Sequence, residues 1–305
     1  MKRKVGISTH FLQTKFGDAE ALKIAKSIGA DAVDFSTIIR SIHDYRKPDT
    51  IYAKSDDEIY SYYRGLKKLA DDLGIEICQT HGRISGFKNI PSEDEAFIEN
   101  MRRDCIACNA LEAKYCVVHS TTTIHLGPDA PKELMHSLNF DLFNRSIAVA
   151  KKYGVIIASE TFGDADKYNC CDFFGNIEEF QKSYNDVCAV GDNKDYMAIC
   201  MDTGHSNKAM RFNNPAPADV IRRLGSDIKV LHLNDNDTLT DQHKIPLTGC
   251  IDWNDVFDAL DEIGYSGVYN MELNLGVIGG KDLEIESADY AVKVMRNLLK
   301  NRYGE

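Results

Sequence analysis

Two stretches decide the fold of this chain, Met197-Ala-Ile-Cys-Met-Asp202-Thr-Gly-His205 and Ile228-Lys-Val-Leu-His232-Leu-Asn-Asp235. Each is a short apolar run, typical of a strand buried in a parallel sheet, and each ends in ionisable residues. A helix is predicted between them, because Pro215-Ala-Pro-Ala-Asp219 is a typical helix start and Gly225 a typical helix end. This strand–helix–strand unit predicts two parallel strands joined by a right-handed crossover.

The same unit recurs along the chain. Short apolar runs alternate with amphipathic stretches, and a glycine stands shortly before five of the runs, as expected where a helix ends ahead of a strand. The eight predicted strands are Val5 to Ser8, Ala32 to Ser36, Ile75 to Thr80, Tyr115 to His119, Val155 to Glu160, Met197 to Asp202, Ile228 to Leu233, and Gly267 to Leu273.

Eight such units close into a barrel more naturally than they form an open sheet, because the side chains of eight strands fill the interior. An open doubly wound sheet is the alternative, but no Gly-x-Gly-x-x-Gly motif follows the first run. No stretch of sequence resembles a linker between domains. We therefore predict an α/β protein that forms a single (β/α)8 TIM barrel over residues 1–305.

Composition excludes several classes of protein. The chain has 36 Lys and Arg residues against 47 Asp and Glu residues, a net charge of −11, which disfavours extended contact with nucleic acid. No apolar run approaches the roughly 18 residues of a membrane span, and no export signal is evident. The nine cysteines have no regular spacing, so neither the Cys105-x-x-Cys108 pair nor Cys170-Cys171 is assigned a metal or redox role. We predict a cytoplasmic protein without a membrane partner.

Ionisable side chains stand at the ends of six predicted strands. In a parallel barrel these ends converge on one face, so residues far apart in sequence become neighbours there. Charged groups at the ends of buried runs lose hydration unless they are paired, and a bound cation removes that cost. Three carboxylates and one imidazole form a ligand set suited to Mn²⁺, Mg²⁺, Co²⁺ or Zn²⁺. The predicted ligands of this one divalent metal ion are Glu160, Asp202, His232 and Glu272.

The same residues occur in patterns that resemble the xylose-isomerase-like TIM-barrel superfamily. That superfamily includes sugar-phosphate isomerases and epimerases, ketose 3-epimerases, inosose isomerases and dehydratases, and apurinic endonucleases. The resemblance covers nearly the whole chain and is most specific over residues 155–275. The patterns that carry it are Glu160, Asp202-x-x-His205, His232-Leu-Asn-Asp235, Asp241-x-His243, the turn Gly249-x-Ile251-Asp252-Trp253, and Glu272.

The resemblance implies a metal-dependent isomerase or epimerase of a small carbohydrate. It assigns the metal to Glu160, Asp202, His232 and Glu272, and places the two glutamates on opposite faces of the substrate. One glutamate removes a proton next to a carbonyl, and the other returns a proton to the resulting enediolate. Return to the same carbon gives epimerisation, and return to the adjacent carbon gives aldose–ketose isomerisation. Glu160 and Glu272 are therefore the predicted catalytic residues.

Other polar residues near the strand ends are predicted to contact the substrate. Arg83 and Lys244 could hold a carboxylate or phosphate on it. His10 is a candidate at the rim, whereas Trp253 is predicted to pack between a helix and the barrel. The predicted substrate-binding residues are His205, His81, His119, Asp241, His243 and Arg83.

Two other activities fit the same residues. An inosose-type dehydratase would use the same metal and base to expel a hydroxyl group. An apurinic endonuclease-like phosphodiesterase would bind three zinc ions, with further zinc on the set His81, His119, His205 and His243. Residues 121–131, after the fourth predicted strand, include no Lys or Arg, which argues against a protein that grips and bends DNA.

One departure from the family pattern bears on the substrate. Thr238 stands where the ketose 3-epimerases carry an arginine, which weakens an assignment to the free-ketose epimerases in particular. Sugar binding without catalysis would leave both glutamates without a role. Homo-oligomerisation stays open.

Overall fold

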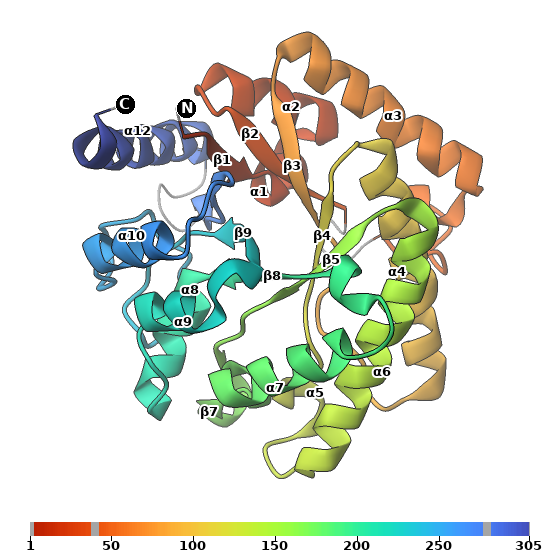
Figure 1. Cartoon of the computed structure of the whole chain (residues 1–305). Coiled ribbons are helices and arrows are strands. Elements are labelled where there is room, and N and C mark those ends of the chain that lie inside the picture. Colours follow the sequence, from red (N-terminus) through yellow and green to blue (C-terminus); the bar gives the residue numbers. More distant parts are fainter. Residues whose placement is uncertain (1–2, 38–42, 277–281, 305) are drawn as a thin grey trace.

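The structure is a computed structural model that describes residues 3–37, 43–276 and 282–304. Within these ranges, eight parallel strands form one sheet: β1 (Val5–Ser8), β2 (Ala32–Ser36), β3 (Glu76–His81), β4 (Tyr115–Val118), β5 (Ile156–Glu160), β8 (Met197–Asp202), β9 (Ile228–His232) and β10 (Tyr269–Met271). The strand order is β10-β1-β2-β3-β4-β5-β8-β9. The sheet closes where the amide of Leu233 donates to Asn270 O at 2.9 Å and the amide of Glu272 donates to Leu233 O at 3.2 Å. The predicted (β/α)8 barrel is confirmed (Figure 1).

All eight predicted strands are present, and their ends differ from the prediction by at most two residues. The largest difference is at β10, which is shorter at both ends than the predicted segment 267–273. Local hydrogen bonds to the carbonyl of Val268, from the Asn270 amide at 2.9 Å and the Tyr265 hydroxyl at 3.0 Å, turn the chain just before the strand. Side-chain pattern alone does not report such a turn.

Helices surround the barrel (Figure 1). The predicted helix between Pro215 and Gly225 is confirmed: it spans Pro217–Leu224, with Gly225 directly after it. In the helix Asp56–Leu73, Ser55 is the N-cap and forms a capping box with Glu58, and Gly74 follows the last residue with φ 66°, a conformation that favours glycine. The helices are α1 (His10–Phe16), α2 (Asp18–Ser27), α3 (Asp56–Leu73), α4 (Pro91–Ala110), α5 (Thr123–Leu126), α6 (Lys132–Ala150), α7 (Ile177–Cys188), α8 (Thr203–Ala209), α9 (Pro217–Leu224), α10 (Trp253–Glu262) and α12 (Glu284–Tyr303).

The inside of the barrel has an apolar floor beneath the strand ends. Val117, Ala158, Ala198, Cys200 and Val230 form a buried cluster separate from the larger core between strands and helices. Alternate residues of a strand share a face, so the residues two positions after Ala158, Cys200 and Val230 point into the barrel above this floor. Those residues are Glu160, Asp202 and His232, which are predicted metal ligands.

A long insertion follows β5 and is fastened to α8. It contains the two-stranded antiparallel sheet of β6 (Asp164–Ala165) and β7 (Cys170–Cys171). The carboxylate of Asp164 is buried between Lys208, at 2.6 Å, and Arg211, at 2.5 Å. These ion pairs connect the insertion to α8 through Lys208 and to the 3-10 turn Met210–Phe212 through Arg211.

The cysteines and the apolar content of the helices agree with what composition predicted. All nine cysteines are free, and Cys105 and Cys108 are buried in α4. None of the clusters of metal-ligating side chains in the described ranges includes a cysteine. No helix among the described residues is both long enough and apolar enough to cross a membrane.

The loop after β9 is held by the buried carboxylate of Asp235. Its Oδ1 atom accepts the backbone amide of Ile251 at 3.1 Å, and its Oδ2 atom accepts the indole N–H of Trp253 at 2.9 Å and the amide of Leu247 at 3.1 Å. Gly249 passes so close that a Cβ there would lie 2.2 Å from Asp235 Oδ1. Trp253 is buried, which confirms that it packs between helix and barrel.

Replacing Asp235 by Ala is expected to lower the free energy of unfolding by about 3 kcal/mol, because several buried N–H groups lose their acceptor at once. Urea denaturation followed by circular dichroism measures this change. Asp255→Asn is the control, since Asp255 forms a partly exposed ion pair with Arg222 at 2.6 Å, and such pairs contribute little to stability. Equal losses in the two variants would contradict the role given to Asp235.

Candidate active site

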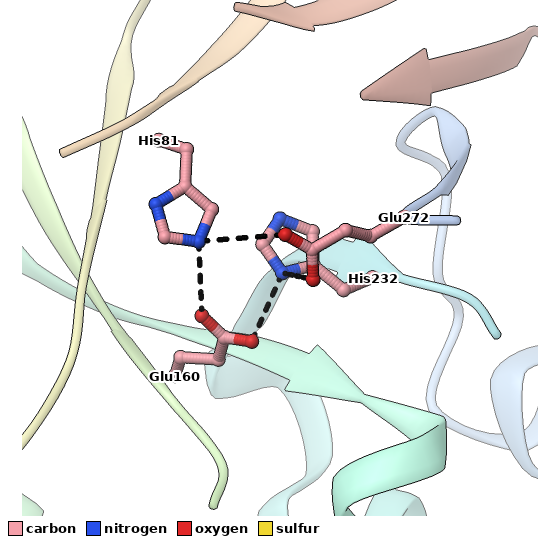
Figure 2. Close-up of side chains that lie close together, drawn as sticks. All are labelled: His81, Glu160, His232 and Glu272. Atoms are coloured by element: carbon pink, nitrogen blue, oxygen red, sulfur yellow. Dashed lines mark hydrogen bonds and ion pairs between the residues drawn. The ribbon is translucent and has the colours of Figure 1, made fainter. Parts of the chain in front are cut away.

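Four side chains from four strand ends meet inside the barrel (Figure 2). His81 ends β3, Glu160 ends β5, His232 ends β9, and Glu272 directly follows β10. The Nδ1 atom of His232 lies 3.1 Å from Glu160 Oε1 and 3.3 Å from Glu272 Oε2. The Nε2 atom of His81 lies 3.6 Å from an oxygen of each glutamate. One donor atom from each of the four residues lies within 4.8 Å of the others.

Asp202 lies next to these four residues, in two further clusters of possible metal ligands that share Glu160 or Glu272 with them. Its carboxylate forms one cluster with Glu160 and His205 and another with His243 and Glu272. The Oδ1 atom accepts the backbone amide of His205 at 2.6 Å, as the N-cap of α8, and the Oδ2 atom accepts an amide hydrogen of Asn234 at 2.8 Å. These two bonds hold the carboxylate in one orientation.

Glu160 is fully buried among imidazoles. Its Oε2 atom lies 2.9 Å from His119 Nε2, and its Oε1 atom lies 3.4 Å from His205 Nδ1. Burial alone would raise the pKa of Glu160, but the charge of His232 and the contact with His119 outweigh it and hold the pKa well below its usual range. Glu160 is therefore a charged carboxylate at neutral pH.

A second group of donors lies toward the mouth of the site. The Oδ2 atom of Asp241 lies 3.2 Å from His243 Nε2 and 3.7 Å from His205 Nε2. Burial opposes the charge on His243, but Asp241 outweighs burial and raises the pKa of that imidazole to about 9. His243 also connects this group to the inner one, since its Nδ1 atom lies 3.6 Å from Glu272 Oε2.

A cavity of about 260 Å³ opens above these residues. Its apolar wall includes Phe162, whose ring centroid lies 5.5 Å from that of His119 and 5.3 Å from that of His205. No sequence pattern singles out Phe162, which directly follows Glu160-Thr161 at the start of the insertion. The residues that line the cavity are His10, Ser36, His81, Ile84, His119, Phe162, His205, Asp241, His243 and Glu272.

Arg83 is the predicted substrate-binding residue that the structure places elsewhere. Its guanidinium donates to both oxygens of the buried Asp104, at 2.6 and 3.1 Å, and to the carbonyl of His43 at 2.8 Å. It lines a different hollow, beyond Ile84. These bonds occupy the groups that would hold an anion, so we leave Arg83 out of the proposed site. The backbone of Lys244 pairs with that of Asp235.

Asp34 is a buried residue of the site that sequence reasoning missed. It lies in the middle of β2, and its Oδ2 atom is 2.8 Å from His232 Nε2. The available signal was a carboxylate inside an apolar run, Ala32-Val-Asp-Phe-Ser36, where an unpaired charge is costly. Its partner could not be read from the sequence.

The donor set fits a divalent cation. The carboxylates of Glu160 and Glu272 converge on one imidazole nitrogen from two strands, and two negative charges in this buried space repel each other unless a cation lies between them. His119 Nε2 and Glu160 Oε2 are close but do not have hydrogen-bond geometry. A mixture of imidazole nitrogens and carboxylate oxygens is typical of Mn²⁺, Co²⁺ and Zn²⁺ sites.

A closed parallel barrel whose ligand-type side chains gather at the C-terminal ends of its strands defines a TIM barrel with its candidate active site in the usual position. The comparison with protein families agrees with this architecture. The chain belongs to the xylose isomerase-like TIM barrel family, whose model matches residues 22–298.

Individual relatives extend the comparison. The inosose isomerase of Bacillus velezensis is 28% identical over 260 residues, which cover 83% of this chain and 81% of that protein. A D-tagatose 3-epimerase-like protein of known structure matches with a TM-score of 0.71 and 20% identity, over 98% of this chain and 99% of that one. The IolI protein, solved with a bound zinc atom, matches with a TM-score of 0.68 and 18% identity, over 98% and 97%. At these identities the two solved structures establish the fold alone.

Proposed function

We propose that this protein is a divalent-metal-dependent isomerase or epimerase of a small carbohydrate or polyol-derived ketone. One observation carries the proposal: Glu160 and Glu272, from strands that are not neighbours, bring their carboxylates within 3.1 and 3.3 Å of the same nitrogen of His232, beneath an open cavity. Two carboxylates facing one small space are suited to removing and returning a proton on a carbon acid.

Glu160, Asp202, His232 and Glu272 would hold the cation. A bound divalent ion supplies Lewis acidity, which makes the proton next to a substrate carbonyl easier to remove. The IolI structure with zinc and the mixture of donor types support this part of the proposal. The choice among Mn²⁺, Co²⁺, Zn²⁺ and Mg²⁺ stays open.

The side chains of the protein supply the proton transfers and the binding. Glu160 is buried and fixed by imidazoles, whereas the Glu272 side chain is 18% exposed and borders the cavity. In the proposed reaction each carboxylate would serve one face of a substrate carbon. His81, His119, His205 and His243 are placed to hydrogen-bond hydroxyl groups, and Phe162 offers an apolar surface to a ring or carbon chain.

The named relatives favour this class over the dehydratase alternative. The curated protein from B. velezensis is an isomerase, and the solved structure with the same fold is epimerase-like. Thr238 still weakens an assignment to the free-ketose epimerases. Inososes therefore belong with ketoses in any substrate panel.

Removal of the metal is expected to lower the rate at which the substrate's α-proton exchanges with solvent deuterium by at least about 100-fold. The reason is that Lewis-acid assistance contributes several kcal/mol. The measurement follows deuterium incorporation by NMR, with a panel of ketoses and inososes, before and after dialysis against a chelator. Adding back Mn²⁺, Co²⁺, Zn²⁺ or Mg²⁺ should restore exchange. Unchanged exchange by fully metal-free protein would contradict metal dependence.

A three-metal phosphodiesterase is the second candidate, and one observation favours it. His205, Asp241 and His243 form a further cluster of donors whose atoms lie within 4.8 Å of one another. Counting bound metal by mass spectrometry separates the candidates. About one ion per chain supports sugar chemistry, whereas about three ions, together with cleavage of abasic DNA, would support the nuclease.

A further inference from the structure

Asp34 and His232 form a fully buried pair across the barrel interior. Both side chains are 0% exposed, and Asp34 Oδ2 lies 2.8 Å from His232 Nε2. The two residues come from β2 and β9, which are separated in the sheet by β10 and β1. The contact therefore forms only when the barrel closes, and it lies on the side of the imidazole that faces away from the glutamates.

The pair leaves the other nitrogen of His232 directed at the candidate metal site. An imidazole ring has two nitrogens, and a hydrogen bond from one of them determines which nitrogen is free to bind a metal. The Nδ1 atom faces Glu160 Oε1 and Glu272 Oε2. With the proton on Nε2 donated to Asp34, Nδ1 would be the nitrogen that binds a cation held by these glutamates. Neither rotation of the ring nor exchange of the two nitrogens is available without losing this bond.

We propose that Asp34 is a positioning residue of the metal centre, which holds His232 in the tautomer and orientation that present Nδ1 to a divalent cation. This inference rests on the proposed function. Asp34 does not touch the substrate cavity and carries no step of the reaction. Its carboxylate also increases the electron density on the imidazole, so its removal weakens a metal–nitrogen bond even if the fold is kept.

The cost of burial supports a dedicated role for this carboxylate. A charge placed in the interior of a barrel loses several kcal/mol of hydration and is tolerated only with a good partner. Two neighbours in sequence on the same face of β2, Ala32 and Ser36, are small and uncharged. The contact with His232 at 2.8 Å therefore accounts for an acid at this position.

The test measures metal affinity rather than turnover. Chelated wild-type protein, Asp34→Asn and Asp34→Ala are titrated with Co²⁺ in competition with a chromophoric chelator. We expect Asp34→Ala to weaken Co²⁺ binding about 10- to 100-fold. Asp34→Asn should weaken it less, because an amide oxygen still accepts the Nε2 proton without the negative charge.

A matched control separates orientation from general damage to the barrel. Gln79 on β3 is the register partner of Asp34 and is equally buried, and Gln79→Leu should leave Co²⁺ affinity within about twofold of wild type. Two-dimensional ¹H–¹⁵N NMR of the zinc-loaded proteins reads the His232 tautomer directly. Wild type should show the proton on Nε2, and Asp34→Ala should lose that signal.

The outcomes are distinct. Wild-type affinity in a folded Asp34→Ala variant would overturn the inference and leave the proposed function standing. Equal weakening by Asp34→Ala and Gln79→Leu would also overturn it, because the effect would then come from packing. A wild-type protein that binds no divalent metal would overturn the inference and the proposed function together.

Discussion

The Glu160→Gln variant is expected to lose at least about 10³-fold in the rate of α-proton exchange, together with most of its metal affinity. Glu160 contacts His119 at 2.9 Å, His232 at 3.1 Å, His205 at 3.4 Å and His81 at 3.6 Å. The neutral amide removes both a proposed base and a carboxylate that all four imidazoles share. Deuterium exchange by NMR and Co²⁺ titration measure the two losses.

The control for this variant is a glutamate–histidine pair outside the site. Glu179 on α7 lies 2.7 Å from His136 Nε2 on α6, so Glu179→Gln removes the same kind of charge pair from the outer layer. It should retain wild-type exchange and metal affinity. Exchange at the wild-type rate by Glu160→Gln would refute the two-glutamate mechanism.

The Glu272→Gln variant is expected to lower interconversion of substrate and product by about 10²- to 10⁴-fold, the usual range for loss of a general acid–base group. The result should differ from that of Glu160→Gln in one respect. If the reaction is an epimerisation, Glu160 remains able to exchange the proton on its own face of the carbon. One epimer should then still incorporate deuterium while conversion to the other stops.

Metal affinity provides the internal check on this second variant. Glu272 is partly exposed and contacts His81, His232 and His243 at 3.3 to 3.6 Å. Glu272→Gln should therefore weaken metal binding less than Glu160→Gln does. Loss of exchange with both epimers at saturating metal would argue against separate faces. Wild-type interconversion would remove Glu272 from the mechanism.

Much of the fold was predictable because its signals are local. Apolar runs such as Met197 to Asp202 and start signals such as Pro215-Ala-Pro-Ala-Asp219 depend on a few consecutive residues, and each formed the element expected of it. The ends of β10 were not predictable, because hydrogen bonds to the carbonyl of Val268 decide where that strand begins. Those bonds depend on the backbone path rather than on side-chain pattern.

The candidate site was partly predictable for a topological reason. Once a parallel barrel is accepted, residues at the strand ends must converge, whatever their distance in sequence, and the structure does bring His81, Glu160, His232 and Glu272 together. Arg83 stands beside one of these positions in sequence, yet its side chain turns to Asp104. Position in the sequence therefore places the backbone of Arg83 near the site, but it does not determine which partner the guanidinium contacts.

By itself the sequence determined the barrel, the face that carries the site, and the types of donor present there, because periodicity, glycine positions and residue identity are properties of short segments. Only the tertiary structure decided which partner each buried charge takes. Asp34 and His232 are 198 positions apart, and Phe162 reaches His119 and His205 from a loop. Such contacts arise when the sheet closes and the space inside it is shared among eight strands, which no local pattern records.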